Sequence, residues 1–191
     1  MNIKIPNTEY EVANWITQRW SARAFRDQHI DETTLNRLFE AASWSASSMN
    51  EQPWHYYYAY KGSEAFNQII DLLMEGNQPW AKDANVILLS LAKKTFDRNG
   101  RPNRHAMHDV GAANTTLLLQ AAEEGILGHM MGGFHMDKAV EAFDIDTNKW
   151  ELACFIALGY PDEATTLEEP YKTRELSARS RNTVESFTQK L

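Results

Sequence analysis

One short stretch limits most strongly what this chain can fold into. Residues 84–92 are apolar almost without a break, and they are centred on the run Val86-Ile87-Leu88-Leu89. A strand with one solvated face alternates apolar and polar side chains, whereas an unbroken apolar strand must be covered on both faces. The fold therefore needs packed layers on both sides of a sheet in which this strand is central.

The rest of the chain supplies the elements for those layers. Apolar residues recur at helical spacing over residues 9–19, 31–42, 63–73, 105–124 and, more briefly, 137–143. Asp31 is a typical N-cap, and Gly125 closes the longest helix. The second half of that helix is apolar nearly all round, so it should be buried within the domain or against another subunit. Strands are expected at residues 54–60 and 151–158.

These elements predict the α+β class, with helices packed on a modest mixed sheet. The length of 191 residues and the absence of repeats or linkers predict one domain over residues 1–191. The net charge of −7 is the wrong sign for a nucleic-acid binder. No apolar run approaches the ~20 residues of a membrane span. Residues 1–6 lack the features of a secretory signal, and the single cysteine, Cys154, fits a reducing cytosol, so we expect a soluble cytoplasmic protein.

Several familiar site motifs are missing. No G-x-G-x-x-G follows a strand, which argues against a dedicated dinucleotide-binding half. Residues 144–155 begin like a calcium loop but lack its required Gly and Glu. His105, His108 and Asp109 share one helical turn without the H-E-x-x-H spacing of a zinc site. We therefore expect no metal, and we interpret these residues as a solvated helix start with His108 at most lining a pocket.

Residues 19–25 read R-W-S-A-R-A-F and follow the first expected helix. Guanidinium groups are planar, permanently charged and able to fork onto phosphate oxygens, and Ser21 adds a third donor. Two arginines after a helix are, on their own, more often a solvated surface.

A second motif changes that interpretation. Residues 45–54 read S-A-S-S-M-N-E-Q-P-W, a small-polar loop that ends at a proline before a strand. The pair R-x-S-x-R-x-F and S-x-x-N-x-Q-P-W, in this order and spacing, resembles the N-terminal signature of the nitroreductase family of flavoproteins. The likeness extends over residues 11–187, through an alanine- and leucine-rich helix, the Gly-rich residues 128–134, a G-Y-P at 159–161 and an R-x-R at 179–181.

The resemblance implies a nitroreductase-like fold with a mainly antiparallel sheet flanked by helices, in an intertwined homodimer with tightly bound FMN at the interface. Residues 160–191 would then form a C-terminal tail that contacts the partner subunit. By the same likeness, no side chain need be catalytic, and the cofactor-binding residues would be Arg19, Trp20, Ser21, Arg23, Ser47, Ser48, Asn50, Asn77, Met131, Gly132, Gly133, Arg179 and Arg181. Ser47, Ser48 and Asn50 would reach the flavin of the opposite subunit. Lys172 and Arg174 form a rival K-x-R pair for the phosphate.

The function implied is an FMN-dependent oxidoreductase that passes electrons from NADH or NADPH through flavin N5 to a nitroaromatic, quinone or similar acceptor in a ping-pong order. A flavin performs its own electron chemistry, which agrees with the lack of an obvious acid, base or nucleophile. Two alternatives stay open at this point. One is another flavin reaction on the same fold, such as dehalogenation, ene reduction or dehydrogenation, and the other is a flavin-binding dimer without catalysis.

Overall fold

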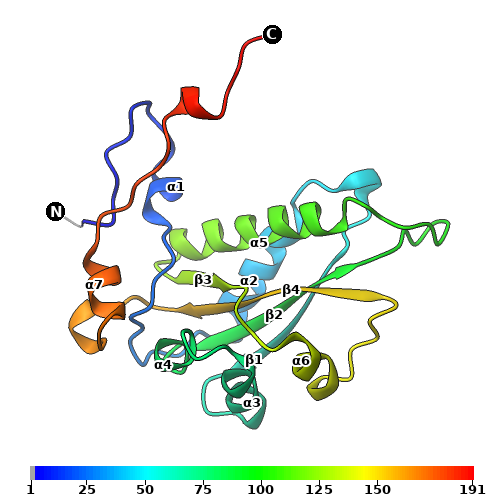
Figure 1. The fold of residues 1–191 in the computed structure, drawn as a ribbon, viewed down its shortest axis with the longest axis horizontal. Coiled ribbons are helices and arrows are strands. Elements are labelled where there is room, and N and C mark those ends of the chain that lie inside the picture. Colours follow the sequence, from blue (N-terminus) through cyan, green and yellow to red (C-terminus); the bar gives the residue numbers. More distant parts are fainter. Residues whose placement is uncertain (1–2) are drawn as a thin grey trace.

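A four-stranded sheet forms the middle layer of the computed structural model, which describes residues 3–191 (Figure 1). Residues 1 and 2, part of the expected 1–191 domain and of the segment searched for a signal, lie outside the described part. The strand order is β1-β2-β4-β3, and every pair is antiparallel. The strands are β1 (Trp54–Tyr60), β2 (Val86–Lys93), β3 (Leu127–Met131) and β4 (Trp150–Gly159).

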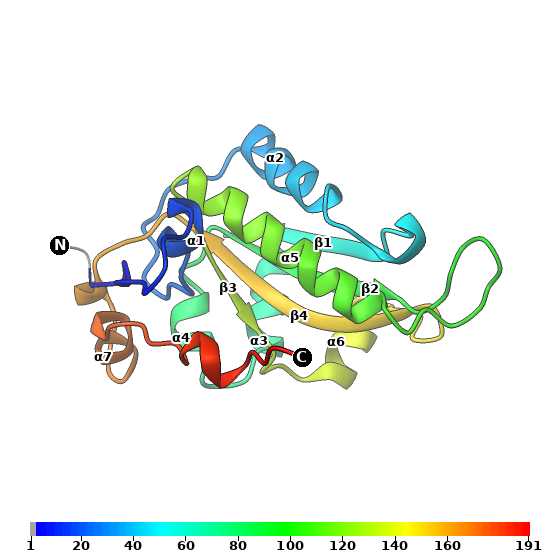
Figure 2. The ribbon, with the colours of Figure 1, turned by 90° about the horizontal axis from the view of Figure 1, so that it is seen from above.

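Helices cover both faces of this sheet (Figure 2). They are α1 (Asn14–Gln18), α2 (Glu32–Ser43), α3 (Glu64–Leu72), α4 (Gln78–Ala81), α5 (Ala106–Glu123), α6 (Met136–Ala142) and α7 (Tyr171–Leu176). Three 3₁₀ turns lie at Ser48–Asn50, Ala164–Thr166 and Val184–Ser186. Within residues 3–191, no helix has the length and apolar character that a membrane crossing requires.

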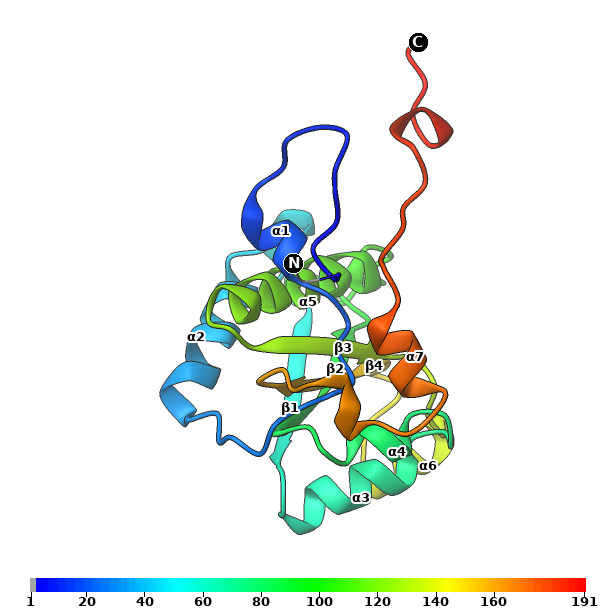
Figure 3. The same ribbon diagram turned by 90° about the vertical axis from the view of Figure 1, so that its left-hand side faces the viewer.

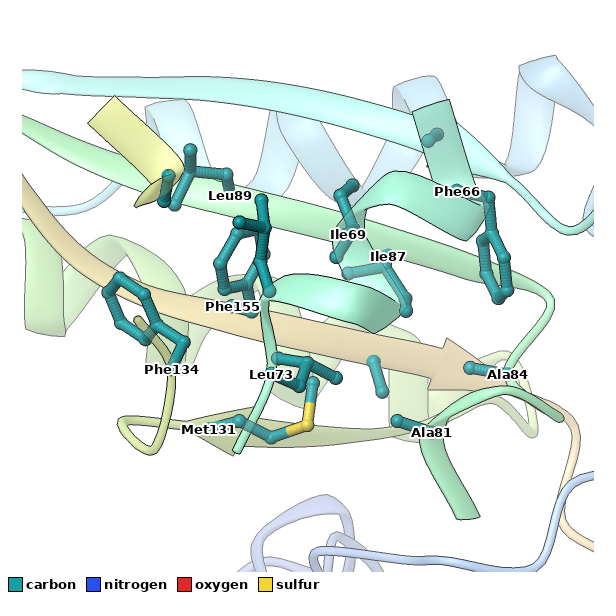
Figure 4. Close-up of a cluster of buried hydrophobic side chains, with 14 of the residues drawn as sticks. Phe66, Ile69, Leu73, Ala81, Ala84, Ile87, Leu89, Met131, Phe134 and Phe155 are labelled. Carbon is teal, nitrogen blue, oxygen red and sulfur yellow. The ribbon is translucent and has the colours of Figure 1, made fainter. Parts of the chain in front are cut away.

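The two faces of β2 explain its unbroken apolar sequence. Val86 and Leu88 pack with α2 and α5 in one core cluster. Ile87, Leu89 and Leu91 point the other way, into a cluster built with α3 and with Phe155 of β4 (Figure 4). All seven residues from Val86 to Ala92 are buried, so the prediction of a central strand covered on both faces is confirmed.

Most of the expected elements lie where the sequence placed them. The Asp31 carboxylate accepts from the backbone N–H of Thr34, 2.8 Å away, and so caps α2 as predicted. Gly125 ends α5 with a φ of 72°. The first helix is shorter than predicted, because α1 begins only at Asn14, and Tyr10 is 56% exposed where the expected helix would have packed it.

Three elements were missed. Strand β3 lies where a Gly-rich turn was expected, and the glycine has a packing reason: a Cβ on Gly128 would lie 2.1 Å from Cδ2 of Leu118 on α5. The short α4 and α7 also escaped the sequence patterns. Helix α7 lies in what was expected to be a polar tail, and it carries the buried Glu175.

The N-terminal segment lies beside α7 of the C-terminal part of the chain (Figure 3). The ammonium group of Lys4 donates to the carbonyls of Arg174 and Ser177, at 3.0 and 2.9 Å. Beyond α7 the C-terminal segment runs away from the body of the fold (Figures 1 and 3). Segments that are far apart in sequence are therefore tied together at this end.

Candidate functional site

Predicted arginines from the N-terminal and C-terminal parts of the sequence lie close together near α1 and α7. The guanidinium of Arg179 donates from one Nη to the carbonyl of Arg19, 2.5 Å away, and from the other to the carbonyl of Thr17. These bonds span the last residues of α1 and its C-cap, so Arg179 also holds the chain that carries Arg19. The convergence of guanidinium groups from opposite ends of the sequence is thus present within one chain.

Like charges accumulate here without a carboxylate to balance them. Burial lowers the pKa of Arg19, and the nearby Arg181 lowers it further. Burial also lowers the pKa of Arg179, and Arg19 and Arg181 add to that effect. Among the described residues, none of these three guanidiniums has an acidic ion-pair partner, and Arg179 Nε is buried without an acceptor. An anion placed among them would relieve their mutual repulsion.

A buried carboxylate organises the neighbouring residues. Glu175 accepts from the indole N–H of Trp20 at 3.0 Å and from the backbone N–H of Arg23 at 3.2 Å. Burial lowers the pKa of Arg23, Glu175 opposes that shift, and the nearby Arg174 reinforces it. The polar edge of the Trp20 ring is therefore engaged with α7. Arg174 lies near Arg23, whereas Arg179 and Arg181 lie near Arg19, so the two rival pairs occupy different parts of the cluster.

His129 on β3 is hydrogen-bonded to the segment that carries Arg19 and Arg23. Its Nδ1–H donates to the carbonyl of Ala22 at 3.0 Å, and its ring packs on Trp80 with the centroids 4.5 Å apart. The guanidinium of Arg23 lies 5.8 Å from the centroid of the Trp80 ring. Burial, together with the charge of Arg23, lowers the pKa of His129 to about 4. The ring is therefore neutral at pH 7, which limits the positive charge beside the arginines.

The predicted residues Asn77, Gly132 and Gly133 also lie close together. Asn77 Nδ2 donates to the carbonyl of Gly133, 3.1 Å away. A Cβ on Gly132 would meet no atom within 4 Å, so the backbone there borders open space. Met131 is 2% exposed and points into the core, so only its backbone is available to a ligand (Figure 4).

The predicted loop of residues 45–52 is strained and anchored to α5. Met49, Asn50 and Gln52 have φ of 57°, 57° and 50°, in the left-handed region that costs side-chain-bearing residues energy. The backbone N–H of Ser48 donates to the carboxylate of Asp109 at 2.9 Å, and Ser47 Oγ accepts from the backbone of Gln52 at 3.0 Å.

Asp109 is a functional candidate that the sequence interpretation missed. It was assigned to a solvated helix start, yet it is 3% exposed and holds both Ser48 and the exposed His108, whose Nδ1 lies 3.0 Å from it. His105 Nε2 accepts from Arg104 Nε at 3.2 Å. No group of three metal-ligating side chains occurs among residues 3–191.

The predicted arginines and the predicted loop of residues 45–52 lie toward opposite ends of the folded molecule. The arginines lie near α1 and α7, whereas the loop of residues 45–52 lies at the other end, beyond the end of α2 (Figures 1 and 2). The structure therefore brings Arg19, Arg23, Arg179 and Arg181 into one cluster, and Asn77 and Gly133 into another pair, but it does not bring Ser47, Ser48 or Asn50 to them. The side chain of Ser21 is exposed beside Arg19.

Two grooves lie away from these residues. One of about 410 Å³ runs between α1, α2 and α5 and is lined in part by Trp15 and Leu119. The other, of about 280 Å³, is lined by Asp27, His29, Tyr60, Lys61 and Asn85. Neither contains a predicted cofactor residue. The apolar groove adjoins the outer side of α5, whose second half was expected to be buried within the domain or against another subunit.

The chain is similar to known proteins in sequence and in fold. The model of the nitroreductase family matches residues 16–79 and 64–160. A crystal structure described as an oxidoreductase containing FMN is 33% identical, with 96% of both chains covered and a TM-score of 0.86. A Desulfovibrio desulfuricans protein crystallised with FMN is 20% identical, with 96% of this chain and 98% of that chain covered and a TM-score of 0.77. A Methanothermobacter thermautotrophicus protein, provisionally named an NADH dehydrogenase/NAD(P)H nitroreductase, is 24% identical over 82% of this chain and 80% of its own length.

Proposed function

This chain belongs to the nitroreductase family, and from that premise we propose that it is an FMN-dependent oxidoreductase that takes electrons from NADH or NADPH. The acceptor would be a nitroaromatic, quinone or similar small oxidised molecule, reduced in a ping-pong order. The observation that carries the proposal is the cluster of Arg19, Arg179 and Arg181, which come from both ends of the sequence and lack a carboxylate partner among the described residues.

The residues present fit an FMN phosphate. A phosphate monoester carries close to two negative charges at pH 7, and planar guanidinium groups bind its oxygens in pairs. Among residues 3–191, no side chain accepts a hydrogen bond from Arg19 or Arg181. One Nη of Arg181 donates to the carbonyl of Ser180 at 2.6 Å, which leaves its other donors for the phosphate. Gly132 borders open space, which suits close approach of a flat ring, and Asn77 lies beside Gly133.

A homodimer would complete the site. Ser47, Ser48 and Asn50 lie far from the arginines of their own chain (Figures 1 and 2), so they can serve the cofactor only where a second copy brings them to it. The groove between α1, α2 and α5 offers an apolar face for that copy. The extended C-terminal segment, with Phe187 69% exposed, offers another.

In this proposal the chain binds and orients rather than transferring protons. Bound FMN would supply the redox chemistry. The arginine cluster would fix the phosphate, neutral His129 would hold the carbonyl of Ala22 and thereby the Arg19–Arg23 segment, and Asp109 would fix the loop through Ser48. The same open face would admit the electron donor and then the acceptor.

The phosphate contact can be tested with two flavins. Purified protein should bind FMN, turn yellow and be bleached by NADH or NADPH without oxygen. Arg19→Gln should weaken FMN binding by about 10- to 100-fold, the range for hydrogen bonds to charged groups, and should leave the affinity for riboflavin, which has no phosphate, nearly unchanged. Arg26→Gln is the matched control, because Arg26 is exposed, lies over the ring of Tyr160 and is not among the charges that shift the pKa of Arg19, Arg23 or Arg179. Equal losses for both flavins would show that Arg19 does not meet the phosphate.

The dimer can be tested by complementation. Arg19→Gln damages one half of each site, and Asn50→Ala damages the other half. A dimer mixed from the two variants would contain one doubly damaged site and one intact site, so mixing should restore activity that neither variant has alone. No recovery after subunit exchange, shown by native mass spectrometry, would contradict a shared site.

A further inference from the structure

A basic hairpin connects β2 to α5. Residues 93–104 hold five of the 19 basic residues of the chain and one acidic residue, Asp97. The remaining residues therefore carry 14 basic against 25 acidic side chains. In a chain with a net charge of −7, this segment is a local concentration of positive charge.

Two of the five cations are used within the fold. Lys93 pairs with Asp97, and the ammonium group of Lys94 donates to the carbonyl of Thr147 at 2.9 Å. The three arginines are exposed and have no carboxylate partner among residues 3–191. They are Arg98, Arg101 and Arg104. Arg104 Nε donates to His105 Nε2 at 3.2 Å, but within the described part of the chain no charge balances any of these three guanidiniums, which lie within seven residues.

The hairpin has a defined shape. The backbone N–H of Phe96 donates to the carbonyl of Arg101 at 2.9 Å, and that of Asn103 donates to the carbonyl of Lys94 at 2.7 Å. Gly100 makes the turn with a φ of 66°. The guanidinium of Arg98 lies 5.3 Å from the centroid of the Phe96 ring. The charges are therefore held on a folded support, which lowers the entropy cost of binding a ligand there.

The hairpin is joined to the loop of residues 45–52. The backbone N–H of Asp97 donates to the carboxylate of Glu51 in that loop. The hairpin then leads into α5, where Asp109 binds the backbone of Ser48. Both segments lie at the same end of the molecule (Figures 1 and 2). Under the proposed function, this places the three arginines beside the entrance to the flavin of the partner subunit.

We propose that Arg98, Arg101 and Arg104 bind the anionic group of the small molecule that enters the flavin site. This inference rests on the proposed function and adds a substrate class to it. NADPH differs from NADH by a phosphate on the 2′-oxygen of one ribose. NADPH therefore carries the larger negative charge of the two electron donors. The hairpin therefore favours NADPH, and the same charges favour acceptors that carry a carboxylate or phosphate over neutral ones.

The test compares substrates that differ only in charge. In Arg98→Gln/Arg101→Gln, kcat/KM for NADPH should fall about 2- to 25-fold, which corresponds to about 1.5- to 5-fold for each exposed ion pair. The value for NADH should change by a smaller factor. Raising the salt from 0.02 to 0.3 M should reduce the NADPH value of the native protein more than that of the variant. Arg26→Gln, which also removes an exposed guanidinium over an aromatic ring, should leave the NADPH/NADH ratio unchanged.

A second pair of substrates identifies the source of the anion. Nitrobenzoate and nitrobenzamide carry the same reacting group with and without a charge. A selective loss for NADPH or for nitrobenzoate supports the proposal and shows which molecule the hairpin binds. Equal effects on charged and neutral members of both pairs, in a variant that still binds FMN and is bleached by donor, would overturn it while leaving the proposed function intact. Failure of the native protein to bind FMN or to be bleached would overturn both.

Discussion

Acidification should destabilise this fold through one buried imidazole. His129 is stacked on Trp80 and donates to the carbonyl of Ala22, and burial together with the charge of Arg23 lowers its pKa from 6.5 to about 4. In the unfolded chain the pKa returns to its usual value. Between about pH 4 and pH 6.5 the unfolded state therefore binds a proton that the folded state does not, so the free energy of unfolding falls as the pH is lowered through this window.

The size of the effect follows from the two pKa values. A shift from 6.5 to about 4 corresponds to about 3 kcal/mol, fully lost only below pH 4. At pH 5 the folded ring is still mostly neutral and the unfolded ring mostly charged, so about 2 kcal/mol of the stability present at pH 7 would be lost. That amount is a large fraction of the stability of an ordinary domain.

Urea unfolding at pH 7, 6 and 5 measures this loss. His129→Gln keeps a side chain that can donate to Ala22 but does not titrate, so the native protein should lose about 2 kcal/mol more than the variant between pH 7 and pH 5. His135→Gln, at an exposed histidine, should follow the native protein. If the free energies of unfolding of the native protein and His129→Gln stayed parallel over this range, the assigned cause would be refuted.

Substitutions at three positions test other parts of the site and of the fold. Gly132→Ala should change the free energy of unfolding by less than about 0.5 kcal/mol, because its Cβ would meet no atom within 4 Å. The same substitution should weaken FMN binding in a flavin titration, and unchanged binding would place the cofactor elsewhere. Gly128→Ala should cost about 1–3 kcal/mol in urea unfolding, because its Cβ would lie 2.1 Å from Leu118 Cδ2, and a neutral result would show that α5 can move away. Asp109→Ala should lower the free energy of unfolding by about 1–3 kcal/mol and weaken FMN binding, because it leaves the Ser48 N–H unpaired. Asp109→Asn keeps an acceptor and should recover most of the stability and most of the FMN affinity. Equal losses in the two Asp109 variants would contradict this role.

The fold was predictable wherever burial leaves a periodic pattern. Strand β2 and helices α2, α3 and α5 were placed to within about two residues, because each buries a face or a stripe of apolar side chains. Strand β3 was not predicted, since its Gly128 indicates a turn unless Leu118 is known to press against it. Helix α7 is short, and its one buried residue is the charged Glu175. Such elements are set by tertiary contacts, which a local pattern does not contain.

The site was predictable in its parts but not in its supports. Arg19, Asn50 and Arg179 were proposed as cofactor-binding residues from motifs that resemble those of the family, and these assignments stay predictions. Asp109 and Glu175 carry no such signal. Their partners lie 61 residues away at Ser48 and 155 residues away at Trp20, and each is a carboxylate that any surface helix could carry. Only the burial of each carboxylate distinguishes it from an ordinary surface residue.

Two unfavourable features of this chain bear on the proposed cofactor site. The arginines near α1 and α7 repel one another, and the loop of residues 45–52 holds three side-chain-bearing residues in the left-handed region, at about 1–3 kcal/mol each. Neither feature is needed to bury the core, which lies in the sheet and the helices packed on it. Each chain carries one cationic end and one strained end, on opposite sides of the molecule. Two copies arranged with these ends together would use both features at each of two equivalent sites. The proposed shared cofactor site would therefore account for costs that the fold of one chain leaves unexplained.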